Sequence, residues 1–232
     1  MKKNIFFAMM LALISFAMTS CGDKESEGLS RLTYYPLLEL KGESYMYVAK
    51  GTNFTDPGFE ASLNGEDVSD QVNINSNLNM KKSGIYTIVY SVKNSDGFSA
   101  NAKRTVVVLD PNNAVEGRYT CKATSYRQRE GAQVAYGRDF EILVIDNEDG
   151  TYFVDDLLGG WYCQRAGYGS NYAMEGLLTI DEDGTVGCVY AHVAGWNDGP
   201  NDLTGSYDAA TKTFNINVLY AAMNFVQTWV KN

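Results

Sequence analysis

Apolar and polar residues alternate along much of this chain, which predicts β-strands. In residues 84–93 four large side chains fall on one face with a period of two: Tyr86, Ile88, Tyr90 and Val92. This spacing is typical of a strand in the core of a β-sandwich. A turn sequence, Asn-Ser-Asp-Gly at 94–97, follows it, and residues 102–109 alternate again. The two segments predict an antiparallel hairpin.

Shorter strands are expected before this hairpin, at residues 34–40, 44–48 and 68–74. Turn sequences separate them, namely Asp56-Pro57-Gly58 and Asn64-Gly65. Proline and glycine at these places favour tight turns over continued strands. We therefore predict a β-sandwich over residues 33–110.

A polar break at residues 110–113 precedes a second series of predicted strands. They are expected at 115–123, 140–146, 151–155, 161–164, 174–180, 185–194, 203–208, 213–219 and 225–230. This number suits a small antiparallel barrel. The chain has 16 tyrosines and 22 glycines but only four prolines, which agrees with an all-β protein rich in tight turns. We place the barrel at residues 111–232.

The first twenty residues have the pattern of a secretory signal peptide. Lys2 and Lys3 precede an apolar run over residues 5–18, which is too short for a typical membrane span. The sequence Met-Thr-Ser-Cys at 18–21 resembles the lipobox of bacterial lipoproteins. That resemblance implies that Cys21 becomes the first residue and carries diacylglycerol and an acyl chain such as palmitate. The alternative is an ordinary secreted protein with an incidental cysteine.

Acidic residues follow Cys21 in a tether over residues 21–32. Asp23, Glu25 and Glu27 resemble the surface-export signal of Bacteroidota lipoproteins. This resemblance implies an outer-membrane lipoprotein that faces the cell exterior. A merely solvated tether, with the protein retained in the periplasm, is the alternative.

The charge of the chain limits the classes of binding partner that we expect, and the spacing of its cysteines limits the kinds of site that they can form. The signal segment holds two lysines and no acidic residue, so the mature part has 17 basic and 28 acidic side chains, a net charge of about −11. Such acidity argues against nucleic acid as a partner. Beyond the membrane lipid at Cys21, we expect a polysaccharide or a protein as the binding partner.

Cys121, Cys163 and Cys188 have no metal-binding spacing, and one disulfide among them is possible.

The first half resembles the bacterial Ig-like domain, related to hyalin repeats, of Bacteroidota surface lipoproteins. Four motifs carry the resemblance: Gly51…Phe54-x-Asp56-Pro57-Gly58-x-x-Ala61, Gly84-x-Tyr86-x-x-x-Tyr90, Asp96-Gly97 and Arg104-x-Val106-x-Val108. It implies a spacer or adhesion module. The second half resembles the lipocalin-like C-terminal domains of such proteins, through Gly117-x-Tyr119 and the hairpin sequence over 203–216, which contains Gly205-x-Tyr207-Asp208.

Two irregular stretches of the second half, 158–172 and 194–202, combine aromatic rings with glycine, amide and carboxylate side chains. This composition suits stacking on sugar rings and hydrogen bonding to their hydroxyls. Four residues are candidates for ligand binding: Trp161, Tyr162, Tyr168 and Trp196. The alternative is that Trp161 and Tyr162 plug the barrel and Trp196 covers its end.

Catalytic and metal-binding patterns are weak throughout. His192 is the only histidine, and Ser206 lacks the Gly-x-Ser-x-Gly context of a hydrolase. Acidic clusters at Asp56, Asp67, Asp70 and Asp96, and at the turns 146–151 and 181–185, are interpreted as turns rather than calcium loops. We expect no cofactor or metal and predict a non-enzymatic surface lipoprotein that binds a glycan or another extracellular ligand. The alternatives are a structural or adhesion protein with a protein partner and, less favoured, a hydrolase with a scattered active site.

Overall fold

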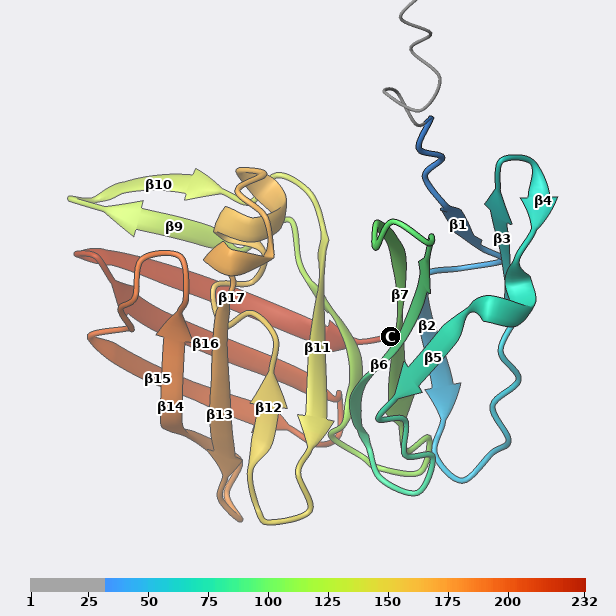
Figure 1. Ribbon diagram of the computed structural model, residues 1–232. Coiled ribbons are helices and arrows are strands. Elements are labelled where there is room, and N and C mark those ends of the chain that lie inside the picture. The colour runs from blue at the N-terminus through green and yellow to red at the C-terminus, as the bar shows by residue number, and fades with distance from the viewer. Residues whose placement is uncertain (1–31) are drawn as a thin grey trace, which may run out of the picture.

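The computed structural model describes residues 32–232. The predicted signal segment, Cys21 and the acidic residues of the tether lie outside the described residues. The described chain is almost entirely β, with a sandwich of two small sheets followed by an antiparallel barrel, as the sequence predicted (Figure 1). Among residues 32–232, no helix has the length and apolar character needed to cross a membrane.

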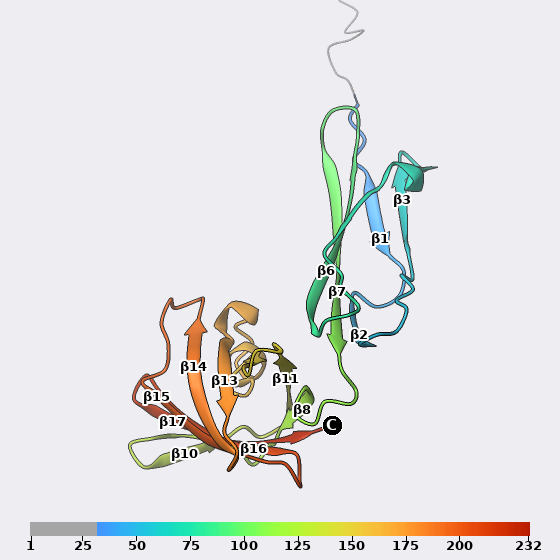
Figure 2. The same cartoon turned by 90° about the horizontal axis from the view of Figure 1, so that it is seen from below.

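The sandwich contains two sheets that face each other. One sheet has the order β1 (Leu37–Leu40), β3 (Phe59–Leu63) and β4 (Glu66–Asp67). The other has the order β2 (Tyr45–Ala49), β7 (Ser99–Leu109), β6 (Gly84–Lys93) and β5 (Asn73–Ser76), in which β2 and β7 run parallel. The 3-10 helix η1 (Ser69–Gln71) connects β4 to β5. The described chain starts at the end of the sandwich that lies away from the barrel (Figure 2).

The predicted β6–β7 hairpin is confirmed, and its apolar faces form the sandwich core. Ile88, Tyr90 and Val92 of β6 are buried, together with Val106 and Val108 of β7. Tyr86, on the same face, is only partly buried because it lies near the end of the sheet.

Arg104 lies on the same core face of β7 and is completely buried. Its guanidinium reaches the segment between β1 and β3, where Nη2 donates to the carbonyl oxygens of Lys41 (2.9 Å) and Gly58 (3.0 Å). Nη1 donates to the carbonyl oxygen of Glu43. A single side chain therefore donates to three backbone acceptors, and the carbonyl oxygen of Gly58 also accepts the backbone N–H of Lys41 at 2.9 Å.

Asp56 supplies the counter-charge of this guanidinium. Its Oδ1 lies 3.4 Å from Nη2 of Arg104, and its other oxygen accepts a hydrogen bond from the hydroxyl of Tyr90. Oδ1 also accepts the backbone N–H of Gly58 at 2.8 Å, which closes the turn. The Asp56-Pro57-Gly58, Tyr90 and Arg104 motifs of the sequence thus meet in one network.

Eight antiparallel strands form the barrel, and β17 pairs with β8 to close it. They are β8 (Gly117–Cys121), β11 (Phe140–Asp146), β12 (Tyr152–Val154), β13 (Met174–Ile180), β14 (Thr185–Val193), β15 (Asp202–Asp208), β16 (Thr213–Tyr220) and β17 (Met223–Lys231). The pairing of β14 with β15 is limited to Thr185↔Ser206 and Val186↔Gly205. The wall of the barrel is therefore weakest between these two strands.

Two features of the barrel differ from the sequence-based prediction. Residues 161–164, expected as a strand, form the π-helix η2 (Trp161–Arg165). An additional hairpin, β9 (Tyr126–Arg129) and β10 (Ala132–Ala135), extends the sheet from β17. Its strands are mostly polar or exposed, so they lack the alternation that would reveal them. The acidic turns at 146–151 and 181–185 join β11 to β12 and β13 to β14, as predicted.

The sandwich and the barrel pack against each other. Val107 of β7 is fully buried against Leu143 and Ile145 of β11. Beside this contact the buried carboxylate of Glu116 accepts hydrogen bonds from the hydroxyl of Ser83 in the sandwich (2.7 Å) and from the backbone N–H of Asp146 in the barrel (2.9 Å). The contact is therefore both apolar and hydrogen-bonded.

The three described cysteines are free thiols. Cys121 is buried in the barrel, Cys163 lies in η2, and Cys188 is exposed on β14. Burial raises the pKa of the Cys121 thiol to about 12. This environment is that of a small apolar core residue rather than a reactive thiol.

Candidate functional site

The segment between β12 and β13 covers one end of the barrel and carries η2 and the 3-10 helix η3 (Ser170–Tyr172). The buried carboxylate of Asp156 organises it. Asp156 accepts the backbone N–H groups of Leu158 (2.9 Å), Gly160 (2.9 Å) and Met174 (3.0 Å). Burial raises the pKa of Asp156, and these hydrogen bonds oppose that rise. One side chain thus fixes both ends of the segment.

Glycines allow this segment to fold tightly against the barrel. Gly159 and Gly160 have φ values of +62° and +84°, a region that side chains disfavour. A Cβ atom at Gly160 would lie 2.8 Å from Cβ of Phe140, and one at Gly159 would lie 2.2 Å from Oε1 of Gln227. The two glycines bring Trp161 directly onto the end of the barrel.

Trp161 is a core residue of the barrel, with only 3% of its surface exposed. Its ring contacts Tyr136, with ring centroids 5.0 Å apart, and Phe225, at 5.8 Å. Trp161 therefore plugs the barrel, the alternative considered from the sequence, and presents almost no surface to a ligand.

The other three candidate residues come together at the surface. The ring centroid of Tyr162 lies 4.8 Å from that of Trp196, and the centroid of Tyr168 lies 6.0 Å from that of Tyr162. Tyr172 and Tyr220 complete the cluster, at 4.8 and 6.2 Å from Trp196. We call these five residues the aromatic platform. Tyr168 and Trp196 are its exposed members, at 56% and 40%.

Backbone hydrogen bonds hold the loop of Trp196 against η3. The N–H of Gly195 donates to the carbonyl oxygen of Asn171 at 2.6 Å, and the N–H of Val193 donates to that of Asp198 at 2.7 Å. The hydroxyl of Tyr220 donates to the carboxylate of Asp198 at 2.7 Å. Burial and this carboxylate raise the pKa of Tyr220. The two irregular stretches of the sequence thus form one structure.

Tyr172 and Tyr220 were not among the predicted site residues. Tyr172 lies within the stretch 158–172, whose aromatic content was a usable signal. Tyr220 stands at the end of β16, where alternation with Val218 predicts only a core residue. Its position in the platform follows from the closure of the barrel.

A small groove of about 140 Å³ adjoins the platform across η3. It is lined by Ser170, Asn171, Ala173, Glu175, Tyr190, His192 and Ala194. His192 lies opposite Glu175 in the β13–β14 ladder and beside the ring of Tyr190, 6.2 Å between centroids. His192 is a strand residue, as its isolation in the sequence predicted.

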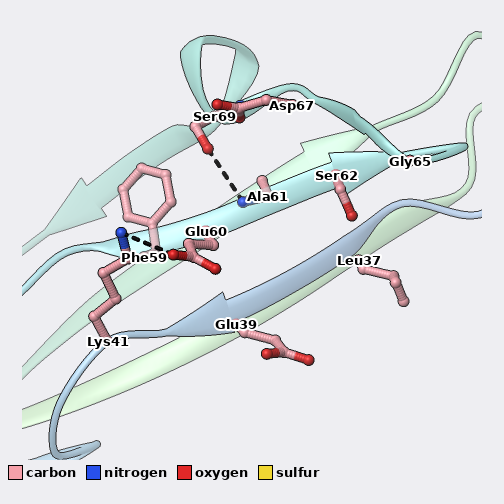
Figure 3. Close-up of a pocket in the computed structure, with 10 residues that line it drawn as sticks. All are labelled: Leu37, Glu39, Lys41, Phe59, Glu60, Ala61, Ser62, Gly65, Asp67 and Ser69. Atoms are coloured by element: carbon pink, nitrogen blue, oxygen red, sulfur yellow. Dashed lines mark hydrogen bonds and ion pairs between the residues drawn. The ribbon is translucent and has the colours of Figure 1, made fainter.

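A larger cavity of about 640 Å³ lies on the β1–β3–β4 sheet of the sandwich (Figure 3). Several of its polar groups already have structural partners. Lys41 pairs with Glu60 at 3.0 Å, Ser69 Oγ accepts the N–H of Ala61, and Asp67 accepts the N–H of Ser69. The polar interactions in this cavity are therefore those that stabilise a sheet surface.

Asp155 precedes the turn of Asp156 and is expected to make barrel stability depend on pH. Burial raises the pKa of the Asp155 carboxyl to about 7, and the charge of Asp156 acts in the same direction. The ordinary value is 3.8. Between about pH 4 and pH 7 the folded state therefore keeps a proton that the unfolded state releases, so the contribution of Asp155 to stability falls as pH rises.

Asp155→Asn is the variant that checks this effect, because its amide oxygen still accepts the backbone N–H of Leu143. Urea unfolding at pH 4.5 and pH 7.5 should show a smaller loss of stability with rising pH in the variant than in the wild type. Glu130→Gln, which removes an exposed carboxylate at the β9–β10 turn, is the control. Equal pH dependence in Asp155→Asn and the wild type would contradict the prediction.

The three tryptophans are expected to differ in solvent accessibility. Trp161 and Trp229 are buried, whereas Trp196 is exposed. Acrylamide should therefore quench one component of the fluorescence readily and leave two protected. Trp196→Phe should remove the accessible component, and retention of that component would show that Trp196 is not its source.

The fold, an Ig-like sandwich followed by a β-barrel, is that of a class of bacterial surface proteins. A family model described as "Bacterial surface protein, Ig-like domain" matches residues 38–108, and a model for a C-terminal domain matches residues 108–231. The crystal structure of the lipoprotein BT2262 from Bacteroides thetaiotaomicron is similar over 85% of this chain and 100% of that chain, with 36% sequence identity and a TM-score of 0.70. The chain belongs to the family of this lipoprotein.

The resemblance to Bacteroidota surface lipoproteins is thereby confirmed, and the protein is associated with the cell surface. Neither family model is that of an enzyme. A structure of the M60 catalytic domain with CBM51 domains from Clostridium perfringens ZmpB matches at 19% identity, over 53% of this chain and 15% of that chain, with a TM-score of 0.29. Similarity at that level supports no inference about the function of this chain. None of the curated proteins matches the sequence.

Proposed function

We propose that this protein is a non-enzymatic lipoprotein that binds a glycan at the cell surface through the aromatic platform of its barrel. In this proposal Cys21 carries the lipid, the anchor lies in the outer membrane, and the protein faces the exterior. The sandwich, residues 33–110, is the spacer, and residues 111–232 carry the site. The observation that supports the proposal best is the convergence of exposed Tyr168 and Trp196 from two loops.

The chemistry of the platform suits sugars. A pyranose ring has an apolar C–H face, which stacks favourably on aromatic rings and leaves its hydroxyls at the edge. Asn171, Asn197 and Asp198 lie in the two loops that carry the exposed rings and provide amide and carboxylate groups. Apolar faces bordered by a few hydrogen-bonding groups are the usual composition of sites for small polar ligands.

The position of the platform also suits a display protein. The described chain enters at the end of the sandwich that is far from the barrel (Figure 2). An anchor at Cys21 would therefore hold the barrel at a distance from the lipid. Several acyl chains buried at ~0.8 kcal/mol per CH₂ would make such an anchor permanent.

Trp196→Ala is expected to weaken glycan binding at least about tenfold, because central aromatic residues contribute about 2 kcal/mol or more to binding. The measurement is affinity electrophoresis against a panel of neutral and acidic polysaccharides, followed by calorimetry on those that bind. Tyr168→Ala should act in the same direction.

Phe98→Ala is the matched control, since Phe98 is an exposed aromatic residue of the sandwich. It should leave binding unchanged. Absence of binding to every polysaccharide, or binding that is indifferent to Trp196→Ala, would count against the proposal.

An apolar patch on β14 favours a second candidate function, the binding of a protein partner. Val189 and Tyr190 are adjacent and more than half exposed. Cross-linking at this strand, abolished by Val189→Asp but not by Trp196→Ala, would support an adhesion role in place of glycan binding.

A further inference from the structure

Three arginines surround η2 beside the aromatic platform: Arg127, Arg138 and Arg165. We infer that they form an anion-binding part of the glycan site, and that the ligand is an acidic glycan bearing carboxylate or sulfate groups. This inference rests on the proposed function, because it names the chemical class of the ligand that the platform binds.

Two of these arginines are held against Trp161. The guanidinium carbon of Arg165 lies 4.2 Å from the ring centroid of Trp161, and that of Arg127 lies 4.9 Å from it. Burial raises the pKa of the hydroxyl of Tyr162, a member of the platform, and the positive charge of the nearby Arg127 opposes this rise. Tyr162 therefore connects the arginines to Trp196. The buried Trp161 fixes cations at the edge of the platform.

Arg138 extends the same positive surface. Its guanidinium carbon lies 4.8 Å from the ring centroid of Phe140, and its Nη2 donates to the carbonyl oxygen of Gln164 in η2 at 3.0 Å. Arg138 and Arg165 are exposed. Stacking on an aromatic ring holds the planar guanidinium in one orientation, which lowers the entropic cost of binding an oxyanion.

None of the three arginines has an ion-pair partner within residues 32–232. Three other basic residues of the barrel do: Arg118 pairs with Glu141, Lys122 with Asp139 at 3.8 Å, and Arg129 with Glu130 at 3.9 Å. The three arginines gather around one short helix of a protein whose net charge is −9. Their positive field attracts an anion to this end of the barrel.

Most donors of these guanidiniums remain available. Arg165 uses Nε for the carbonyl oxygen of Tyr136 at 3.1 Å, and Arg138 uses one Nη2 bond. Nε of Arg127 is buried and has no hydrogen-bond acceptor in the described chain. A guanidinium has five N–H donors in a planar fork. The remaining Nη groups of Arg138 and Arg165 suit bidentate contact with a carboxylate or a sulfate.

The buried carboxylate of Asp156 lies beneath η2 and forms no ion pair with these arginines. Its oxygens accept three backbone N–H groups and lie 3.0 Å from the thiol of Cys163. Its hydrogen bonds are directed inward, to the segment that it organises. The arginines therefore keep their positive charge toward the solvent.

The experiment compares polymers that share a backbone and differ in charge. Polygalacturonate is used before and after methyl esterification, and dextran sulfate is compared with dextran, so that carboxylate and sulfate are tested separately. Affinity electrophoresis and calorimetry are run on the wild type and on Arg165→Gln, Arg138→Gln and Lys212→Gln. Lys212 is an exposed cation at the other end of β16 from Tyr220 and provides the charge-matched control.

We expect the wild type to bind at least one acidic polymer about tenfold or more tightly than its neutral counterpart. Arg165→Gln and Arg138→Gln should each weaken that binding about tenfold, the usual effect of losing a charge-assisted hydrogen bond. Lys212→Gln should change it less than twofold. Thermal unfolding of each variant shows whether the fold is retained, and binding of the wild type should weaken with salt.

The outcomes separate the two proposals. Binding that depends on Trp196 but is equal for neutral and acidic polymers, and indifferent to both arginine variants, would overturn the acidic ligand and keep the glycan site. An equal loss of affinity in Lys212→Gln would show that binding depends only on the net charge of the protein. That result would also overturn the assignment of the site to the arginines. Absence of binding to all four polymers and to the wider panel would overturn both.

Discussion

Arg104→Met is expected to lower the free energy of unfolding of the sandwich by about 3–5 kcal/mol, the usual cost of removing one member of a buried ionic network. The substitution keeps an unbranched apolar side chain but removes every donor. The carbonyl oxygens of Lys41 and Glu43 then lose the donor from Arg104, the carbonyl oxygen of Gly58 keeps only the N–H of Lys41, and Asp56 loses its counter-charge. Urea unfolding followed by circular dichroism measures the effect.

Lys103→Met is the matched control for Arg104→Met. Lys103 is the preceding residue of β7, and its side chain is exposed. Its replacement should change stability by no more than about 0.5 kcal/mol, as is usual for surface positions. A loss below about 1 kcal/mol in Arg104→Met would show that the buried network contributes little net stability.

Trp161→Ala is expected to destabilise the barrel by about 3–5 kcal/mol, as large-to-small substitutions in a core do. The variant would lose the aromatic contacts with Tyr136 and Phe225 and the cation–π contacts of Arg127 and Arg165. Thermal or urea unfolding, monitored by near-ultraviolet circular dichroism, measures the loss.

Trp196→Ala provides the comparison within the same site. Because Trp196 is 40% exposed and stands in a surface loop, its removal should cost no more than about 1 kcal/mol. We thus expect Trp161→Ala to lower mainly the stability of the barrel and Trp196→Ala to lower mainly its affinity for the ligand. Equal destabilisation by both substitutions would mean that the loop of Trp196 is part of the barrel core.

The class of fold could be predicted because strands leave a local signal. The alternation of Ile88, Tyr90 and Val92 predicted the buried face of β6, and the turn sequences predicted where strands end. Arg104 shares the period-two face of Val106 and Val108, but the sequence analysis named it only as part of a family motif and did not predict its burial. Its acceptors come from a turn more than forty residues away, which no local pattern shows.

The irregular parts of the barrel were less predictable for a physical reason. Trp161 and Tyr162 are apolar enough to suggest a strand, but Gly159 and Gly160 adopt positive φ and Asp156 captures the backbone N–H groups that a strand would need. The rings around Trp196 were found by composition. Their meeting, and the addition of Tyr220, depend on barrel closure.

The contact of Val107 with Leu143 and Ile145, together with Glu116, has a mechanical consequence. Modules joined by a free linker tumble independently, and a pull on one merely straightens the linker. In this protein a force applied to the barrel acts directly on the contact between β7 and β11. The contact therefore restricts rotation of one module relative to the other. If the barrel binds a polymer as proposed, tension on the barrel would pass into the strands of the sandwich through this contact.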